Sequence, residues 1–388
     1  MSATAKMHGM DGALVEHDWP SLSLPELRAL LRGFPVIGDP REILSVSPRP
    51  FSAASVVRTA SGRVFIKRHH RSVRDREGLL EEHRFIRHLF ARGARVQRVV
   101  ANESGETAIE MGEWTYEVHD ASRGVDLYAD AQSWTPFRCT QHAHQAGRAL
   151  AKMHLAAEGF EAPRRVVRPI VASFTIFAAE DPVSAMVRYL DARPSLATHR
   201  GVRDCGQRAL NLLASLHAEL APLLPALTPL WTHNDLHASN LLWSGTNDSA
   251  HTEAIIDFGL ADCTNAVHDI AHAIERNIVE WLALVENPNA PDDVRVHLDH
   301  LSALLDGYES VRPLSPQEAA ALAPMTVLCH AEFALSEADY FLGVLHAENR
   351  AAMAYDGWLV GHARWFHARA GRSLLDALRK RAHAGAAR

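Results

Sequence analysis

Two short polar segments joined by an apolar hairpin constrain this chain of 388 residues more than any other feature. The first segment, residues 232–240, reads Thr-His-Asn-Asp-Leu-His-Ala-Ser-Asn and places Asn240 five positions after Asp235. The second, residues 255–259, reads Ile-Ile-Asp-Phe-Gly and places Asp257 after an apolar run. Either segment alone would be read as polar residues that cap turns. Together and in this order, they predict one shared site.

The region between the two segments predicts how they meet. Residues 241–243 and 254–256 are apolar, and a polar, glycine-containing stretch separates them. This pattern predicts two short strands paired as a hairpin, which brings Asn240 and Asp257 to the same end. In phosphoryl transfer, one carboxylate accepts the proton of the attacking hydroxyl, and an amide and a second carboxylate hold Mg²⁺ against nucleotide phosphates. The two segments have the residues for that chemistry.

Composition places the chain among ordinary soluble globular proteins, because 47% of its residues are hydrophobic and 22% are charged. Residues 1–20 are charged and lack an apolar core, so we expect no signal peptide. No stretch approaches ~18 uninterrupted apolar residues, so we expect no membrane span. The four cysteines include no C-x-x-C pair, which indicates a reduced, cytoplasmic protein.

The net charge of −6 is unevenly distributed. Residues 58–98 hold twelve Arg or Lys and four Asp or Glu, a balance of +8, whereas residues 270–345 hold three Arg and twelve Asp or Glu, a balance of −9. Both runs can be solvated helix faces; alternatively, they are a basic nucleotide end and an acidic substrate end. Nucleic-acid binding is disfavoured, because acidic residues interrupt the basic run and the whole chain is acidic.

Short elements are expected in the first third of the chain. Hydrophobic periodicity and turn signals predict helices at 23–34 and 78–92 and strands at 43–46, 55–59, 63–67, 107–111 and 114–118. The strand at 63–67 ends on Lys67. Glu82 lies within the apolar stripe of the helix at 78–92, where an unpaired carboxylate is costly. We therefore expect Lys67 to pair with Glu82, with Glu81 as the alternative.

Residues 119–124 form a polar connector and a plausible hinge. Beyond them the pattern is almost wholly helical, apart from the hairpin. The expected helices cover residues 141–157, 182–190, 206–223, 267–285, 292–308, 316–345 and 358–381.

These features together resemble the protein-kinase-like fold. A strand lysine and a helix glutamate precede H-x-D-x-x-x-x-N, which begins at His233, and D-F-G, which begins at Asp257. More narrowly, the chain resembles the small-molecule branch of aminoglycoside phosphotransferases, choline kinases and homoserine kinases. That branch often has histidine two positions after the aspartate, as in His237, where protein kinases typically have lysine. No Ala-Pro-Glu follows Asp257, so the activation segment of a protein kinase is missing.

Other motifs extend the resemblance over roughly residues 40–370. Residues 149–154 (Ala-Leu-Ala-Lys-Met-His) resemble the L-A-x-L-H helix of the same branch, and Asp269 resembles the aspartate that braces the catalytic loop. Residues 307–308 and 312–314 look most like the homoserine-kinase subgroup.

The resemblance implies an α+β, two-lobed fold. Residues 1–118 would form a nucleotide-binding lobe with a small antiparallel sheet, in which 1–40 are a helical lead-in. Residues 119–388 would form a helical lobe with the catalytic loop, the metal site and the acceptor pocket. The implied activity is an ATP- and Mg²⁺-dependent transfer of the γ-phosphate to a hydroxyl of a small metabolite.

The resemblance also implies residue roles. Asp235 would be the catalytic base, Asn240 and Asp257 the Mg²⁺ ligands, and His233 and Asp269 the brace of the catalytic loop. Lys67 would clamp the α- and β-phosphates with Glu82 as its partner, and the region of His119 would present backbone groups to adenine. The phosphate loop at 47–55 contains no glycine, so Ser52 and Ala53 would turn their N–H groups to phosphate and Arg49 would add charge. Asn234 stands where the family usually has glycine.

The acidic run is the one indication of the acceptor. Seven carboxylates would favour an amine-bearing acceptor if they face the pocket, namely Glu275, Glu280, Asp306, Glu309, Glu332, Glu337 and Asp339. Trp281, Trp358 and Trp365 would either add a cation–π surface or fill the core. An amino alcohol, a hydroxy amino acid and an amino sugar all satisfy this pattern.

Three alternatives compete with a small-molecule kinase. His268-Asp-Ile-Ala-His272 resembles a zinc-protease helix, but it has Asp where that motif has Glu. A protein kinase is disfavoured by His237. A catalytically silent nucleotide-binding regulator on the same fold is disfavoured by the intact catalytic residues and stays open because the phosphate loop lacks glycine.

Overall fold

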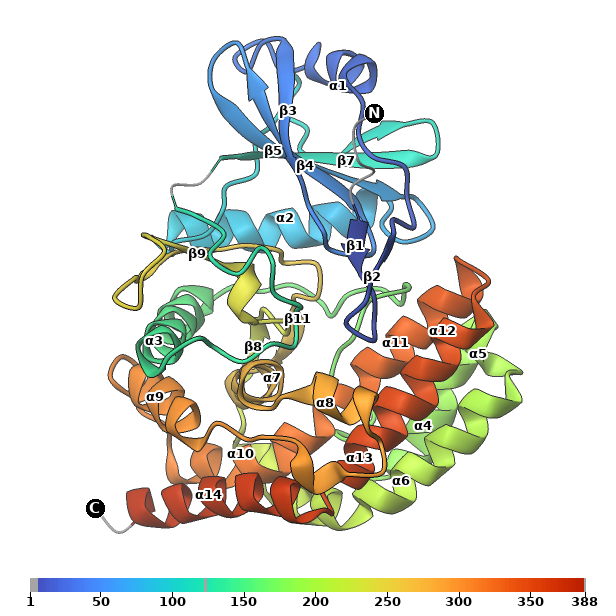
Figure 1. Ribbon diagram of the computed structural model, residues 1–388, viewed down its shortest axis with the longest axis vertical. Helices are drawn as coiled ribbons and strands as arrows, with labels where there is room; N and C mark the ends of the chain where they lie inside the picture. The colour runs from blue at the N-terminus through green and yellow to red at the C-terminus, as the bar shows by residue number, and fades with distance from the viewer. Residues whose placement is uncertain (1–5, 122–123, 387–388) are drawn as a thin grey trace.

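The computed structural model, which describes residues 6–121 and 124–386, places a small β-sheet lobe above a larger helical lobe (Figure 1). The upper lobe is built on a five-stranded antiparallel sheet of order β3-β4-β5-β7-β6. Its strands are β3 (Pro40–Val46), β4 (Ala53–Thr59), β5 (Arg63–His70), β6 (Ile109–Met111) and β7 (Trp114–Asp120). The predicted small antiparallel sheet is therefore confirmed.

The two faces of this sheet have different roles, because successive side chains of a strand point to opposite faces. Val64 and Ile66 of β5 pack in an apolar cluster with α1 (Leu24–Leu31). Lys67, which alternates with them, is paired in register with Glu117 of β7 on the other face. That face carries α2 (Arg76–Ala91), whose His83 contacts Glu117.

The N-terminal region differs from the predicted helical lead-in. A hairpin of β1 (Lys6–His8) and β2 (Leu14–Glu16) precedes α1 and reaches down to the helical lobe (Figure 1). Asp18 forms an ion pair with Arg350 of the helical lobe, and the indole of Trp19 donates to the Tyr340 hydroxyl at 3.1 Å. Residues 6–20 therefore contact the helical lobe as well as the sheet lobe, and they are not a helical lead-in.

The lower lobe is mainly helical, as predicted, and its helices surround one large apolar core. α3 (Thr140–Ala157) and α9 (Leu298–Glu309) pack closely because Gly147 and Gly307 lie at their contact. A Cβ atom on either glycine would lie 2.0 Å from a backbone oxygen of the other helix. The remaining helices are α4 (Pro182–Asp191), α5 (Pro194–Ala197), α6 (Arg200–Leu220), η1 (Ala221–Ala226), α7 (Ala266–Ile278), α8 (Trp281–Glu286), η3 (Pro291–Asp293), α10 (Pro316–Leu328), α11 (His330–Gly343), α12 (Glu348–Ala352), η4 (Met353–Val360), α13 (Gly361–Trp365) and α14 (Arg369–Ala386).

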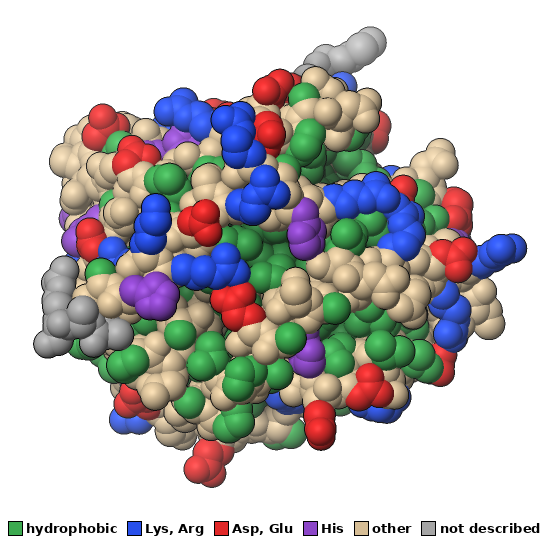
Figure 2. All heavy atoms as spheres, turned by 90° about the horizontal axis from the view of Figure 1, so that it is seen from below, with side chains coloured by type: hydrophobic (Ala, Val, Ile, Leu, Met, Phe, Trp, Pro, Cys, Tyr) green, Lys and Arg blue, Asp and Glu red, His purple; other side chains and the backbone are tan. Residues whose placement is uncertain are grey.

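One helical segment, Pro316–Gly343, is long and apolar enough by composition to cross a membrane, but 89% of its most apolar window is buried inside the fold. That burial is typical of a core helix. The exposed charges of the lobe are mixed: viewed from below, Lys and Arg side chains are interspersed with Asp and Glu (Figure 2).

Two small antiparallel pairs support the catalytic segments. β9 (Leu241–Trp243) pairs with β10 (Thr252–Ile255), which is the predicted hairpin. β8 (Pro229–Thr232) pairs with β11 (Asp262–Asn265). The short helix η2 (Ala238–Asn240) leads directly into β9. Both polar segments of the sequence therefore lie in loops that connect these two pairs, at the cleft between the lobes.

Candidate active site

The catalytic loop between β8 and β9 is fixed by Asn234, which has a positive φ of 61°. Asn adopts this left-handed conformation more readily than most residues. Its side chain also holds the loop, because Nδ2 donates to the Leu260 carbonyl at 3.1 Å and Oδ1 accepts from Thr232 at 2.8 Å. Asparagine thus meets the backbone requirement of the usual glycine and adds hydrogen bonds.

Asp269 holds the same loop from below. Its two carboxylate oxygens accept the backbone N–H groups of His233 and Asn234, both at 2.8 Å. His154 lies 3.0 Å from one of these oxygens. Burial would raise the pKa of Asp269, but the His154 contact and the backbone donors hold it below its ordinary value. Asp269 therefore holds the backbone at His233 and Asn234, and the bracing role that the resemblance implied for His233 and Asp269 stays a prediction.

Asp235, Asn240 and Asp257 converge at the cleft. Asn240 Nδ2 donates to the Asp235 carbonyl at 2.9 Å, and Lys67 Nζ donates to Asp257 Oδ1 at 2.9 Å. Burial raises the pKa of Asp235 to about 6, although Arg276 opposes the shift. Burial also disfavours the charge of Asp257, but Lys67 holds its pKa well below its ordinary value. Of the two carboxylates, Asp235 is therefore the one suited to accept a proton.

The predicted pair of Lys67 with Glu82 is wrong. Glu82 Oε1 accepts instead from Arg74 Nε and Arg165 Nη2, both at 2.7 Å, and is 3% exposed. Two guanidinium groups satisfy this buried carboxylate, so Lys67 bonds to Asp257. Glu81, the alternative, contacts Arg165 and Arg168. The sequence could not identify Arg165, because it lies in an irregular segment far along the chain.

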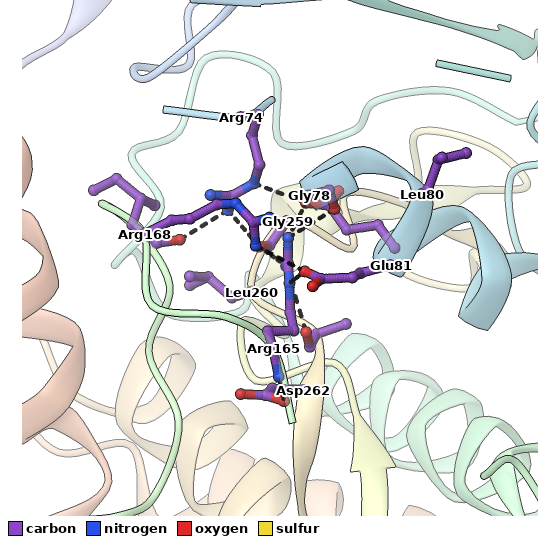
Figure 3. Close-up of polar contacts among 12 residues, drawn as sticks. Arg74, Gly78, Leu80, Glu81, Arg165, Arg168, Gly259, Leu260 and Asp262 are labelled. Atoms are coloured by element: carbon purple, nitrogen blue, oxygen red, sulfur yellow. Dashed lines mark hydrogen bonds and ion pairs between the residues drawn. The ribbon is translucent and has the colours of Figure 1, made fainter. Parts of the chain in front are cut away.

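Arg74 and Arg165 form a latch between α2 and the segment after Asp257 (Figure 3). Both guanidinium groups donate to the Gly259 carbonyl, at 2.6 and 2.7 Å, and Arg165 also donates to the Gly78 carbonyl at 3.0 Å. The side chain of Arg165 is fully buried. Arg74, Glu82 and Arg165, which we call the latch, therefore fix the position of α2 relative to the segment that follows Asp257.

The first of two cavities in the cleft has a volume of about 300 Å³ and lies under the β3–β4 loop. His119 lines it, but His119 belongs to β7 and not to the predicted connector. Its imidazole lies 2.8 Å from Glu117 Oε2, and His69 and His83 also bond to Glu117. The connector therefore begins after Asp120, and this buried histidine cluster was not predicted.

The phosphate loop contributes only part of the expected residues. Residues 47–49 of the loop line the 300 Å³ cavity. Ser52 lines the second cavity instead, and Ala53 is the first residue of β4 and lines neither.

The second cavity, of about 120 Å³, contains Asp235. The β1–β2 hairpin covers it with residues 8–10, and its wall includes Trp134 and Phe333. Arg276 and Glu337 also line it, and they are 1% and 3% exposed. The two cavities share four lining residues, Arg49, Lys67, Asn240 and Asp257. We call them the nucleotide cavity and the acceptor cavity.

Seven acidic residues would favour an amine-bearing acceptor if some of them face the pocket. Among the seven, only Glu337 lines the acceptor cavity. The others have different surroundings: Glu275 is buried behind Arg276, Glu280 contacts His297, Glu332 accepts backbone N–H groups, Asp339 contacts Ser195, and Asp306 and Glu309 contact Arg381. The three tryptophans, Trp281, Trp358 and Trp365, are core residues.

The zinc-helix alternative is not supported by the side-chain contacts. His268 Nδ1 lies 3.0 Å from Asn234 Oδ1, and the Asp269 carboxylate is occupied by the backbone of the catalytic loop. His268 and Asp269 of this motif therefore contact the loop that begins at His233.

Comparisons with known proteins identify the family of the chain. The sequence profile described as "Phosphotransferase enzyme family" matches residues 49–314. Homoserine kinases of Methylobacterium radiotolerans and Xanthobacter autotrophicus are 27% and 28% identical to the chain, over 70% and 76% of its length and 71% and 79% of theirs.

Solved structures show the same fold. A microcompartment-associated aminopropanol kinase superposes with a TM-score of 0.56 at 15% identity, covering 90% of this chain and 98% of that one. A spectinomycin phosphotransferase, solved with ADP and spectinomycin, superposes with a TM-score of 0.51 at 12% identity, covering 89% and 98%. The family profile spans more than half of the chain, which therefore belongs to the phosphotransferase enzyme family and is a small-molecule kinase with a two-lobed, protein-kinase-like fold.

Proposed function

We propose that this kinase uses Mg-ATP to phosphorylate the hydroxyl of a short zwitterionic acceptor, a hydroxy amino acid. The observation that carries the proposal is a pair of buried ionisable side chains in the acceptor cavity: the guanidinium nitrogens of Arg276 and Oε2 of Glu337 lack hydrogen-bond partners among the described residues.

Arg276 is suited to bind a carboxylate. None of its three guanidinium nitrogens has a hydrogen-bond partner among the described residues. Its Nε lies 3.3 Å from Asp235 Oδ1, and the guanidinium centre lies 4.1 Å from the ring centre of Phe333. A buried guanidinium is costly unless it is hydrogen-bonded, and its planar fork matches a carboxylate. An acceptor carboxylate would supply the missing partner.

Glu337 is suited to bind an ammonium group. Its Oε2 is buried without a hydrogen-bond partner among the described residues. Burial raises the pKa of Glu337 to about 8, and the charges of Asp235 and Glu275 also raise it, whereas Arg276 lowers it. An ammonium group beside this carboxyl would favour its ionised form.

The size of the cavity favours a short acceptor. Its volume of about 120 Å³ is below the ~300–1,000 Å³ of sites for drug-sized ligands. The acceptor hydroxyl must reach Asp235 while the acceptor carboxylate contacts Arg276. Asp235 Oδ1 and Arg276 Nε are 3.3 Å apart. The hydroxyl and carboxylate of the acceptor are therefore only a few bonds apart. The relatives named homoserine kinases support this choice over an amino sugar.

The residues at the shared wall fit Mg²⁺. Asn240 uses Nδ2 to bond to the catalytic loop, so its carbonyl oxygen is free to face a cation, and Asp257 has one carboxylate oxygen away from Lys67. Carboxylate and amide oxygens are the hard ligands that Mg²⁺ prefers. Bound there, Mg²⁺ would neutralise charge on the nucleotide phosphates.

The reaction follows from these positions. The acceptor oxygen forms a bond to the γ-phosphorus, the bond from that phosphorus to the β–γ bridging oxygen breaks, and ADP leaves. Asp235 accepts the hydroxyl proton, Lys67 contacts the phosphates, and Arg276 and Glu337 orient the acceptor. Since little covalent chemistry falls to the protein, positioning and charge supply most of the catalysis.

The test uses three acceptors that differ by one group. Homoserine has both charges, 3-amino-1-propanol lacks the carboxylate, and 4-hydroxybutyrate lacks the amine. ADP release from Mg-ATP should give homoserine a kcat/KM about 10²-fold or more above both others, because a missing group leaves a buried partner unpaired. Arg276→Gln should remove the advantage over 3-amino-1-propanol, and Glu337→Gln the advantage over 4-hydroxybutyrate. Asp235→Asn is the blank. A preference for 3-amino-1-propanol or for a neutral sugar would refute the zwitterion proposal.

A further inference from the structure

The phosphate loop makes its turn without glycine. Phe51 has a positive φ of 73°, and its ring packs edge-on against Tyr340, with ring centres 5.0 Å apart. Within the loop, the N–H of Arg49 donates to Ser47 Oγ at 3.3 Å, and the N–H of Ser47 donates to the Ala54 carbonyl at 2.9 Å. These two backbone groups are therefore engaged by the protein and are not available to a phosphate.

The side chain of Arg49 lies where the two cavities meet. It lines both of them, together with Lys67, Asn240 and Asp257. The group that moves from nucleotide to acceptor must pass through this shared wall. Arg49 is the one residue of the four to which the resemblance gave no defined contact.

Two backbone carbonyls hold the guanidinium of Arg49 in place. Nη1 donates to the Ala131 carbonyl at 2.7 Å, and Nη2 donates to the Tyr128 carbonyl at 3.1 Å. These bonds fix the plane of the group but use only two of its five N–H donors. They do not neutralise its charge, and no carboxylate among the described residues lies within ion-pair distance of it. Three N–H donors of Arg49 and its full positive charge therefore remain available to a ligand.

Nearby carboxylates keep Arg49 charged without pairing with it. Burial lowers the pKa of Arg49, and the charges of Asp126, Asp257 and Asp235 raise it. A guanidinium is protonated at any physiological pH. The loop therefore presents a fixed cation at the shared wall.

We propose that Arg49 binds the phosphoryl group during transfer, in place of the backbone amides of a glycine-containing loop. This inference rests on the kinase reaction proposed above and adds a residue to it. As the acceptor oxygen bonds to the γ-phosphorus and ADP leaves, Arg49 donates hydrogen bonds to the non-bridging oxygens of the moving group. It transfers no proton; the hydroxyl proton goes to Asp235. A preorganised donor aimed at such oxygens is worth ~10²–10³-fold in rate.

The test distinguishes binding of the γ-phosphate from binding of the rest of the nucleotide. In Arg49→Gln, affinity for ADP should stay within about threefold of wild type, whereas affinity for Mg-AMP-PNP should fall roughly tenfold or more, because only AMP-PNP has a γ-phosphate to meet the charge. The kcat should fall about 10²-fold. Arg58→Gln is the matched control, since Arg58 is exposed on β4 and pairs with Glu42; it should leave all three quantities unchanged.

Other results would overturn the inference. Equal losses of ADP and AMP-PNP affinity, or a kcat within threefold of wild type, would show that Arg49 only supports the loop. Arg49→Lys keeps the charge but not the planar fork, so its kcat should fall at least about tenfold; a wild-type kcat in this variant would also overturn it. If Arg49→Gln does not fold, the lysine variant decides alone. The nucleotide measurements need no acceptor, so they test Arg49 even if the proposed acceptor is wrong.

Discussion

Replacing Asp235, the proposed catalytic base, should stabilise the protein while it strongly reduces turnover. Burial raises the pKa of Asp235 from its ordinary value of 3.8 to about 6. Between these values the unfolded carboxyl is ionised while the folded one is protonated, so raising the pH favours unfolding. One pKa unit corresponds to ~1.4 kcal/mol, so the ionised carboxylate costs about 3 kcal/mol of folding free energy above pH 7. A fifth of the side chain is exposed (21%), which makes this value an upper limit.

Asp235→Asn removes this cost, because an amide does not ionise. The substitution loses little in return, since the one side-chain bond of Asp235, from Asn240 Nδ2, is long at 3.4 Å. Urea titration without nucleotide or Mg²⁺ should give a free energy of unfolding about 1–3 kcal/mol above wild type at pH 7.5. The gain should shrink to about half at pH 5, where the folded carboxyl is largely protonated. Turnover should fall ~10²–10⁴-fold.

The same substitution at the neighbouring carboxylate is the matched control. Lys67 holds the pKa of Asp257 below its ordinary value, through a bond of 2.9 Å. Its ionised form stabilises the fold above that ordinary value, so Asp257→Asn should lower stability at pH 7.5. At pH 7.5, Asp235→Asn should therefore raise the free energy of unfolding and Asp257→Asn should lower it. A variant Asp235→Asn that is no more stable than wild type, or whose gain is the same at pH 5 and 7.5, would refute it.

Three further predictions follow from the site. The acceptor kcat/KM should decrease as the pH falls below about 6, because protonation of Asp235 removes the base; a rate that is flat from pH 7 to 5 would contradict this assignment. Glu82→Gln should lower the free energy of unfolding by about 3–5 kcal/mol in a urea titration, since it leaves Arg74 and Arg165 buried without their anion, whereas the exposed Glu77→Gln should have no comparable effect. Binding of homoserine at pH 7 should release a proton, because an ammonium group lowers the pKa of Glu337 from about 8; calorimetry in buffers of different ionisation enthalpy measures this release, and Glu337→Gln should abolish it.

The parts of the fold that the sequence predicted are those set by local patterns. Alternation and turn residues predicted the sheet strands, and helical periodicity predicted α2 and α3 to within a few residues. The hairpin between Asn240 and Asp257 was predicted because its two apolar runs flank one polar turn. The β1–β2 hairpin was missed, since each of its strands has only three residues and no clear alternation.

Ion-pair partners could not be predicted in the same way. Lys67 and Glu82 were expected to pair because Lys67 ends the predicted strand that precedes the helix of Glu82. The outcome depended on Arg165, which approaches α2 from an irregular segment far along the chain. Likewise, α7 was predicted as a helix, but only the packed structure shows that Arg276 points into the acceptor cavity. The partner of a charged side chain depends on all groups that surround it in the folded structure, whereas the sequence shows only its neighbours along the chain.

Burying the ionisable groups of the acceptor cavity costs folding free energy, and this cost is an argument about function. Arg276, Glu337 and Asp235 are all largely withdrawn from water, and each would be less costly as an apolar residue or with a protein partner. The latch shows that this fold can satisfy a buried charge completely, since Glu82 is held by two guanidinium groups at 2.7 Å. In the acceptor cavity, by contrast, the guanidinium nitrogens of Arg276 and Oε2 of Glu337 have no hydrogen-bond partner among the described residues. Stability therefore does not account for these charges, whereas a ligand with a carboxylate, an ammonium group and a hydroxyl would satisfy all three.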